Sequence, residues 1–271
     1  MFKRDMVLLY HNITPPRFFL RTEPMVAIRA WFGRFQLIMC SKRWNYAAVS
    51  EFNRSELIKM GKSPVALLPC QVTVGKATNV KKSPQPSIFF AGRIVENKNC
   101  IVLVQQMEKV AIELDGPLRL IILGTGNQKR QYFKYFCDTV ERLRSRGRLQ
   151  IEWINGEIDD ESLAGLYAES WLYVSMSLHE GFGLPVCEAI VRGTPAVYLS
   201  CGGTESVLGG AGSMPASNAD EFFHAVIDHL RSEGDRQSLL VAQQEALASY
   251  LPPHSEEKVV RGILQLFGGR S

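Results

Sequence analysis

Short apolar runs alternate with longer amphipathic segments along most of the chain. From Ser87 onward the runs are rich in Val, Ile, Leu, Phe and Tyr, as buried strands are, and glycine or polar turns close them. The runs that predict strands are SIFFAG, LRLIILG, LQIEWIN, WLYVSMS and PAVYLS. The segments between them that predict helices are 100–113, 128–146, DDESLAGLYAES and PVCEAIVRG. This alternation predicts a doubly wound parallel sheet with helices on both faces.

The same pattern precedes Ser87 in a shorter form. The strands predicted there are MVLLY, NYAAVS and PVALLP, with helices at EPMVAIRAWFGRFQLIMC and EFNRSELIKM. A polar, basic, Pro-containing stretch then reads as a linker. We therefore predict an α/β protein with two Rossmann-like lobes. Residues 1–75 form the first lobe, 76–87 the linker, 88–253 the second lobe, and 254–271 a helix that packs back toward the first lobe.

Composition narrows the class of protein without naming it. The net charge of +4 is too weak to indicate nucleic acid, but it suits a phosphorylated ligand or an anionic membrane surface. The six cysteines are scattered, with no zinc-ligand spacing, which favours a reducing compartment, the cytoplasm. We expect no secretory signal in MFKRDMVLLYHN and no segment able to span a bilayer.

Ligands of open parallel sheets bind at the carboxyl ends of the strands, and unusual residues follow three strand ends here. The first strand end is FFAGRIVENKN, in which Gly92 is followed by Arg93 and Lys98. An anion could bridge the guanidinium fork of Arg93 and the ammonium of Lys98. Taken alone, such a pair is more often two solvated surface cations.

The second strand end is ILGTGNQ, where Gly124 begins a glycine turn. It lacks the G-K-[ST] of a P-loop, so that motif is rejected. A tight turn into a helix explains it at least as well as close approach of a nucleotide base. A Rossmann dehydrogenase is also disfavoured, since no G-x-G-x-x-G with an acid at the expected distance is present.

The third strand end is LHEGFGLPVCEA. The glycines and the following helix N-terminus favour an anion, so a diphosphate could lie over Gly181 to Leu184. Carboxylates repel a diphosphate, and we therefore place Glu188 on a ribose and Glu180 on a transferred sugar. Each glutamate is explained equally well as an ordinary loop or helix-dipole residue.

Two neighbouring features are ambiguous or negative. The pair His179 and Glu180 would need a histidine at Phe182 to form H-E-x-x-H, so a zinc metalloprotease is rejected. Farther on, SCGGTESVLG supplies another glycine turn with Glu205 opening a short helix. An ordinary loop and cap explain that stretch as well as a ligand does.

Taken together, these stretches resemble the retaining glycosyltransferases of the GT-B fold, in the large group 1 family. FAGRIVENKN is similar to that family's phosphate-binding strand and loop, and EGFGLPVCEA to its two glutamates separated by seven residues. RGTPAVYLSCGGTESVLGGAG continues the match. Farther back, YHNITPPRFF and VSEFNRSELIKMG resemble the second half of the family's acceptor-side domain.

The resemblance implies a chemistry and a set of residues. A sugar would move from a nucleotide-diphosphate sugar, such as GDP-mannose or a UDP-hexose, to a polysaccharide or lipid-linked glycan. No metal and no further cofactor are expected. The residues implied to be catalytic are Glu180, Arg93, Lys98 and His11. Those implied to bind the donor are Gly92, Gly124, Gly181, Phe182, Gly183, Leu184, Glu188 and Glu205.

One departure from the family pattern affects this interpretation. The family's first strand and its Gly-rich loop have no counterpart, so the acceptor-side lobe is expected to be partial, with an open sheet edge and an apolar helix face. A partner chain completing that lobe, and an inactive donor-binding fragment, are the alternatives to a self-sufficient enzyme. The helix around AIRAWFGRFQLIM could also lie at the inner face of a membrane, although a core helix is favoured.

Overall fold

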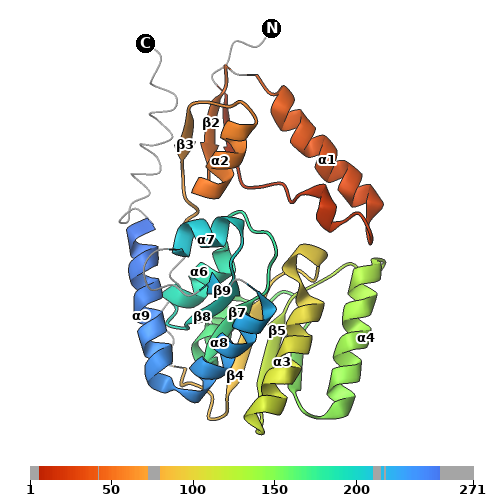
Figure 1. Ribbon diagram of the computed structural model, residues 1–271, viewed down its shortest axis with the longest axis vertical. Coiled ribbons are helices and arrows are strands. Elements are labelled where there is room, and N and C mark those ends of the chain that lie inside the picture. Colours follow the sequence, from red (N-terminus) through yellow and green to blue (C-terminus); the bar gives the residue numbers. More distant parts are fainter. Residues whose placement is uncertain (1–5, 42, 73–79, 210–214, 217, 251–271) are drawn as a thin grey trace.

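The structure is a computed structural model that describes residues 6–41, 43–72, 80–209, 215–216 and 218–250. It contains two parallel β-sheets, and the smaller lies above the carboxyl ends of the larger (Figure 1). This confirms the α/β prediction with parallel sheets. The predicted helix at 254–271 lies outside the described residues. No described helix combines the length and apolar character that a bilayer span requires.

The larger sheet has the strand order β6-β5-β4-β7-β8-β9, and every pairing is parallel. Its strands are β4 Ser87–Ala91, β5 Arg119–Leu123, β6 Gln150–Ile154, β7 Leu172–Ser175, β8 Ala196–Leu199 and β9 Pro215–Ala216. The chain order reverses next to β4, which lies between β5 and β7. Such a switch point leaves a crevice at the strand ends, where open α/β sheets bind ligands.

Helices cover both faces of this sheet because its strands carry apolar side chains on both sides. Ile88 and Phe90 of β4 pack with α3 (Cys100–Leu114), α4 (Gln131–Arg146) and α8 (Ala219–Arg231). Phe89 points the other way and packs with α5 (Asp160–Glu169), α6 (Leu184–Val191) and α7 (Gly202–Leu208). Helix α9 (Glu233–Tyr250) reaches both cores.

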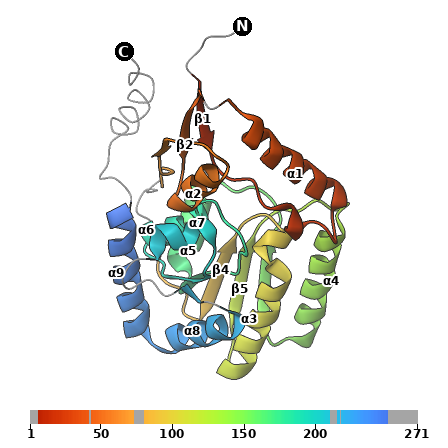
Figure 2. The ribbon, with the colours of Figure 1, turned by 45° about the horizontal axis from the view of Figure 1, so that its top comes forward.

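The smaller sheet is built from three parallel strands in the order β1-β2-β3. These are β1 Val7–Tyr10, β2 Asn45–Ala48 and β3 Val65–Leu67, connected through α1 (Pro24–Met39) and α2 (Glu51–Lys59). A short 3₁₀ turn, Pro16–Phe18, precedes α1. Figure 2 shows α1 running along the outside of this lobe, with its first turn toward α4. An ion pair of 4.0 Å between Glu23 and Arg130 joins the two helices there.

Local signals in the sequence set several helix ends. Asp159 caps α5 by accepting from the backbone N–H of Ser162 at 2.7 Å. Ser50 caps α2 in the same way through Asn53 N–H at 3.2 Å. Lys62 is only 1% exposed, and its ammonium donates to the carbonyl groups of Ile38 and Cys40 at the end of α1. A buried cation there satisfies carbonyl groups that lack partners within the helix.

Candidate functional site

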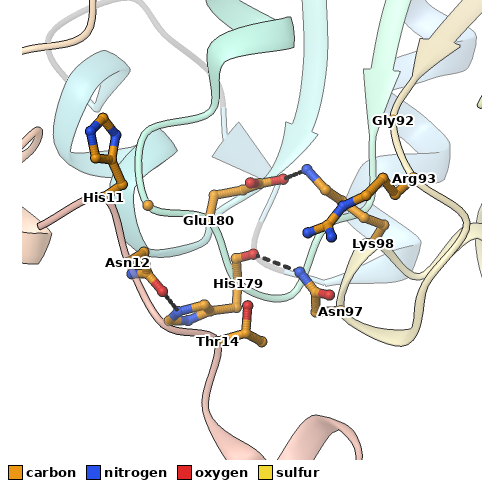
Figure 3. Close-up of a pocket in the computed structure, with 10 residues that line it drawn as sticks. His11, Asn12, Thr14, Gly92, Arg93, Asn97, Lys98, His179 and Glu180 are labelled. Atoms are coloured by element: carbon orange, nitrogen blue, oxygen red, sulfur yellow. Dashed lines mark hydrogen bonds and ion pairs between the residues drawn. The ribbon is translucent and has the colours of Figure 1, made fainter. Parts of the chain in front are cut away.

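A polar pocket of about 330 Å³ lies between the two lobes, at the carboxyl ends of β1, β4 and β7 (Figure 3). Both lobes contribute side chains to it. The lining residues are His11, Asn12, Thr14, Gly92, Arg93, Asn97, Lys98, His179, Glu180 and Gly181.

The segment after β4 supplies the cations of the pocket. Gly92 and Arg93 follow the strand directly, and Lys98 ends a 3₁₀ turn, Glu96–Lys98. Asn97 fixes this turn to the loop after β7, because its side-chain amide donates to the carbonyl of His179 at 3.3 Å and its carbonyl accepts from Leu178 N–H at 2.8 Å. The loops from two neighbouring strands therefore form one wall.

The loop after β7 supplies the carboxylate and a helix N-terminus. Gly183 caps α6 with φ of 89°, a left-handed conformation that favours glycine. The helix begins at Leu184, with Pro185 in its first turn. A Cβ atom on Gly203 would lie 2.0 Å from the carbonyl oxygen of Gly181, so the first turn of α7 packs tightly against this loop. The two backbones can approach this closely because glycine has no side chain.

Lys98 and Glu180 form an ion pair within this wall of the pocket, with 2.5 Å between Nζ and Oε1. Their side chains are 14% and 15% exposed, so little water screens the attraction. An ammonium group has three N–H donors, and Glu180 takes one of them. Two remain for an anionic ligand. The sequence had placed these residues on different groups of a ligand, and it gave no sign that they pair with each other.

Arg93 is the second cation of the pocket. Its side chain is exposed and makes no ion pair within the part of the chain that the structure describes. Figure 3 shows the guanidinium directed into the same space as Lys98. Together the two cations give this side of the pocket the positive potential that a diphosphate would need.

The first lobe contributes His11 and Asn12, which follow β1. His11 is exposed and lies across the pocket from the cations (Figure 3). Asn12 faces His179, with 2.8 Å between Asn12 Oδ1 and His179 Nε2. Burial is the main cause that lowers the pKa of His179, because the charged imidazolium loses solvation between Phe18 and Phe52.

Glu188 lies on α6, outside the residues that line the pocket. Its Oε2 accepts from the hydroxyl of Tyr167 at 3.1 Å, and that bond fixes the direction of the carboxylate. Burial, with the nearby Glu188 charge as a smaller cause, raises the pKa of Tyr167 well above its usual value. Tyr167 therefore stays a hydrogen-bond donor at any ordinary pH.

The predicted residues divide into two groups. Six line the pocket, namely His11, Gly92, Arg93, Lys98, Glu180 and Gly181. The others lie outside its lining, namely Gly124, Phe182, Gly183, Leu184, Glu188 and Glu205. Gly124 has a packing reason of its own, because a Cβ atom there would lie 2.0 Å from the Gly92 carbonyl oxygen.

Sequence reasoning missed four lining residues, Asn12, Thr14, Asn97 and His179. Each is within three residues of a predicted one, so proximity to a motif was the available signal. His179 had been considered only as a zinc ligand. Among the residues that the structure describes, no three His, Cys, Asp or Glu side chains gather as they would around a metal ion.

Comparison with known proteins places this arrangement in a family. Residues 85–232 match the family described as glycosyl transferases group 1. The O-antigen chain mannosyltransferase B of Escherichia coli is 27% identical over 206 residues, which are 70% of this chain and 52% of that protein. The mannosylfructose-phosphate synthase of Agrobacterium fabrum is 31% identical over 117 residues, 43% of this chain and 26% of that one. The chain thus spans about half the length of the first of these relatives.

Solved structures show the same fold at low sequence identity. The sucrose-phosphate synthase from Thermosynechococcus elongatus aligns with a TM-score of 0.74 and 17% identity, over 99% of this chain and 68% of that one. The structure of TarM aligns with a TM-score of 0.73 and 15% identity, over 97% of this chain and 50% of that one.

The fold of this chain, two α/β lobes with parallel sheets, is the GT-B fold of these solved structures. The family match covers more than half of the chain, including β4 to β8 and the whole of the Lys98 and Glu180 wall. The chain belongs to the glycosyl transferases group 1 family.

Proposed function

We propose that this chain carries the donor site of a retaining glycosyltransferase. It would transfer a sugar from a nucleotide-diphosphate sugar, GDP-mannose or a UDP-hexose, to a hydroxyl of a polysaccharide or lipid-linked glycan. The pocket between the lobes carries this proposal, because it sets two cations and a carboxylate of one lobe opposite a histidine of the other. The names of the relatives agree, since they include mannosyl transfer and, for TarM, a complex with UDP.

The residues of the pocket suit separate parts of such a donor. Arg93 and Lys98 would bind the diphosphate and stabilise the charge that grows on it as it leaves. Backbone N–H groups at Gly183 and Leu184, at the start of α6, would add to that stabilisation. Glu180 would accept hydrogen bonds from hydroxyls of the transferred sugar.

The remaining predicted residues complete the donor assignment. Glu188 would bind the ribose hydroxyls from outside the pocket lining, in the orientation that Tyr167 gives it. His11 would face the transferred sugar from the first lobe. Gly92, Gly124, Gly181 and Phe182 would shape the surface around the donor, and Glu205 would lie beside the nucleotide.

The transfer itself is a substitution at the anomeric carbon. The bond from that carbon to the diphosphate oxygen breaks, and its electron pair leaves with the diphosphate. The acceptor oxygen forms the new bond on the same face, through an oxocarbenium-like state, and its proton passes to a diphosphate oxygen. We propose that Arg93, Lys98 and the α6 N-terminus make a metal ion unnecessary for this step.

A second candidate is a donor-binding chain that needs a partner polypeptide for transfer. Helix α1 favours it, because its exposed apolar side chains need a cover that the described residues do not provide. The exposed large apolar residues of α1 are Met25, Ile28, Trp31, Phe32, Phe35, Ile38 and Met39. Transfer by the purified chain alone would exclude this candidate, whereas transfer only after a partner chain is added would support it.

Helix α1 is also relevant to whether the protein contacts a membrane. Arg29 and Arg34 occur among the exposed aromatic residues of α1, as in helices that lie at an anionic membrane surface. A protein cover suits α1 better, because the ion pair of Arg34 with Glu56 holds that arginine toward the first lobe. We therefore propose a cytoplasmic protein in which membrane contact is secondary. Flotation with anionic vesicles at low salt would show such contact, and an unbound fraction equal to that with neutral vesicles would exclude it.

Lys98→Ala tests the donor site directly. Loss of one charged hydrogen bond should weaken binding of UDP or GDP by about 1.5–3 kcal/mol, which is roughly 10- to 150-fold. Lys109→Ala is the matched control, since Lys109 is an exposed lysine on the helix that follows, α3. Calorimetry should show weaker binding only for Lys98→Ala. Equal affinities for both variants and the wild type would remove Lys98 from the diphosphate.

A screen of nucleotide sugars by thermal shift would identify the donor. A ligand that binds only the folded chain raises the melting temperature, by an amount that grows with concentration over its dissociation constant. Of UDP and GDP, we expect the one that belongs to the true donor to raise the melting temperature more. No shift with any nucleotide at millimolar concentration would contradict the proposed site.

A further inference from the structure

Asn12 has a backbone conformation that its residue type rarely adopts. Its φ is 124°, in the region that favours glycine, and it lies between β1 and the pocket. A non-glycine residue is kept in such a conformation only when its surroundings hold it there. We therefore consider which contacts of the Asn12 side chain hold this backbone conformation.

The hydrogen bonds of Asn12 have only one consistent direction. Its amide nitrogen lies 2.7 Å from Asn53 Oδ1 and 3.4 Å from Glu56 Oε2. An ionised carboxylate only accepts hydrogen bonds, so the NH₂ group of Asn12 must face Glu56. Its Oδ1 then faces His179 and can only accept. The ring nitrogen Nε2 of His179 must therefore carry a proton and donate it across the lobe boundary at 2.8 Å.

Glu56 anchors this set of bonds within the first lobe. Arg34 donates to its Oε1 at 2.9 Å, and the hydroxyl of Tyr10 donates to its Oε2 at 3.0 Å. The Glu56 side chain is 13% exposed, which limits screening by water. The direction of the bond between Asn12 and His179 is thus set by an ion pair on the far side of Asn12.

The backbone beside His179 is held by the same lobe. A Cβ atom on Gly181 would lie 2.3 Å from the His11 carbonyl oxygen and 2.7 Å from Asn12 Cβ. The two chain segments can meet only because residue 181 is glycine. Ser50 also donates from its hydroxyl to the Gly181 carbonyl at 2.6 Å. Glu180 therefore lies between two residues that the first lobe holds.

We propose that Asn12 is a positioning residue that fixes the loop from Leu178 to Gly181 against the first lobe. By accepting the His179 hydrogen bond it sets the place of Glu180, and with it the Lys98 pair that faces the pocket. The link from this loop to sugar transfer rests on the proposed function of Glu180. The contact between Asn12 and the loop is independent of that proposed function.

Asn12→Gly separates the hydrogen bond from the backbone conformation. Glycine adopts a φ of 124° without strain, so the variant loses the side-chain bonds while its fold is retained. Asp115→Gly is the matched control, because Asp115 also has positive φ, 47°, at the end of α3 and far from the pocket. His179→Gln keeps an N–H donor near the position of Nε2, and His179→Ala removes it.

Amide hydrogen exchange of peptides covering residues 178–183 is the decisive measurement. Loss of one net hydrogen bond should speed exchange there by roughly 3- to 10-fold in Asn12→Gly and His179→Ala. Asp115→Gly should exchange like the wild type, and His179→Gln should recover most of the protection. Unchanged exchange in Asn12→Gly would overturn the proposal. Equal acceleration throughout both lobes would overturn it too, because it would show a general loss of stability.

Kinetics with a nucleotide sugar then test the consequence for transfer. A misplaced Glu180 should lower kcat several-fold in Asn12→Gly, while the donor KM changes less because Arg93 and Lys98 remain. A change in KM alone would contradict positioning of the sugar. If the wild type binds no nucleotide, the proposed function fails, but the exchange experiment still decides whether Asn12 holds the loop.

Discussion

The two lobes differ in how completely they bury their apolar surface. In the second lobe the inner strands β4, β7 and β8 are covered by helices on both faces, and Phe89, Phe90 and Tyr173 are at most 1% exposed. In the first lobe α1 buries only Ala27 and Leu37, and Trp31 and Phe32 are more than half exposed. Figure 1 shows the same contrast, with α1 lying to one side of its sheet.

This difference indicates that the two lobes are stabilised in different ways. The second lobe closes its own core, so the residues that we propose to bind the donor lie on a well-packed base. The first lobe relies on contacts with the second, through α2 on α7 and the bonds of Ser50 and Asn12. An exposed apolar helix of this extent marks a surface for association. The pocket therefore has one wall from the second lobe, which packs on its own, and one from the first lobe, which depends on contacts with the second.

The largest expected difference between the lobes is in the free energy of unfolding that is lost when an aromatic side chain is removed. Phe89→Ala, in the middle of β4, should lower the free energy of unfolding by about 3–5 kcal/mol, because it leaves a cavity against Tyr167 and Tyr173. Phe35→Ala on α1 should stay within about 0.5 kcal/mol, since Phe35 is 45% exposed. Urea denaturation would measure both. Similar losses at the two positions would mean that α1 is packed and the contrast is wrong.

Most of the second lobe could be predicted from the sequence because its signals are local. Strands β4 to β8 and helices α3 to α6 lie where the apolar periodicity placed them, with ends shifted by a few residues. The two-residue strand β9 was missed, because Pro215 and Ala216 carry no periodicity. The linker prediction extended through Ser87, where β4 already begins.

The pocket was only partly predictable, for a different reason. Arg93, Lys98 and Glu180 could be found from strand ends, since the carboxyl edge of a parallel sheet collects them. The bond between Asn12 and His179 joins residues that are 167 positions apart and belong to different lobes. Its existence depends on how the lobes dock, and no local pattern encodes that orientation.

The next largest effect concerns Glu188 of the second lobe, which we propose to bind the ribose of the nucleotide. Glu188→Gln should weaken the binding of UDP or GDP by about 1.5–3 kcal/mol, the range for a hydrogen bond to a charged group, if its carboxylate binds the ribose. Inorganic pyrophosphate should bind the variant and the wild type equally, because it has no ribose. Calorimetry with both ligands would measure this. Equal weakening of the two would place Glu188 on the phosphates instead.

A smaller effect on stability, with a larger one on association, is expected on α1. Phe32→Gln should change the free energy of unfolding by less than about 0.5 kcal/mol, since the side chain is 54% exposed. It should also reduce concentration-dependent self-association, measured by sedimentation velocity, because it interrupts the apolar face. Gln36→Ala is the control, since Gln36 is an exposed polar residue of the same helix. Destabilisation by Phe32→Gln in the monomer would show that this face is already covered.

The smallest effect should appear at the boundary between the lobes, as a dependence of stability on pH. Burial lowers the pKa of His179 below its usual value of 6.5; Glu56 and Glu180 oppose that shift, and Arg34 and Arg17 add to it. Between the lowered pKa and 6.5 the unfolded chain binds more protons than the folded chain, so stability falls as pH falls through this window. His179→Gln cannot take up the proton but keeps a donor for Asn12. Denaturation from pH 7.5 to 5 should therefore show a shallower loss of stability for the variant, and parallel curves would mean that His179 titrates as it does in the unfolded chain.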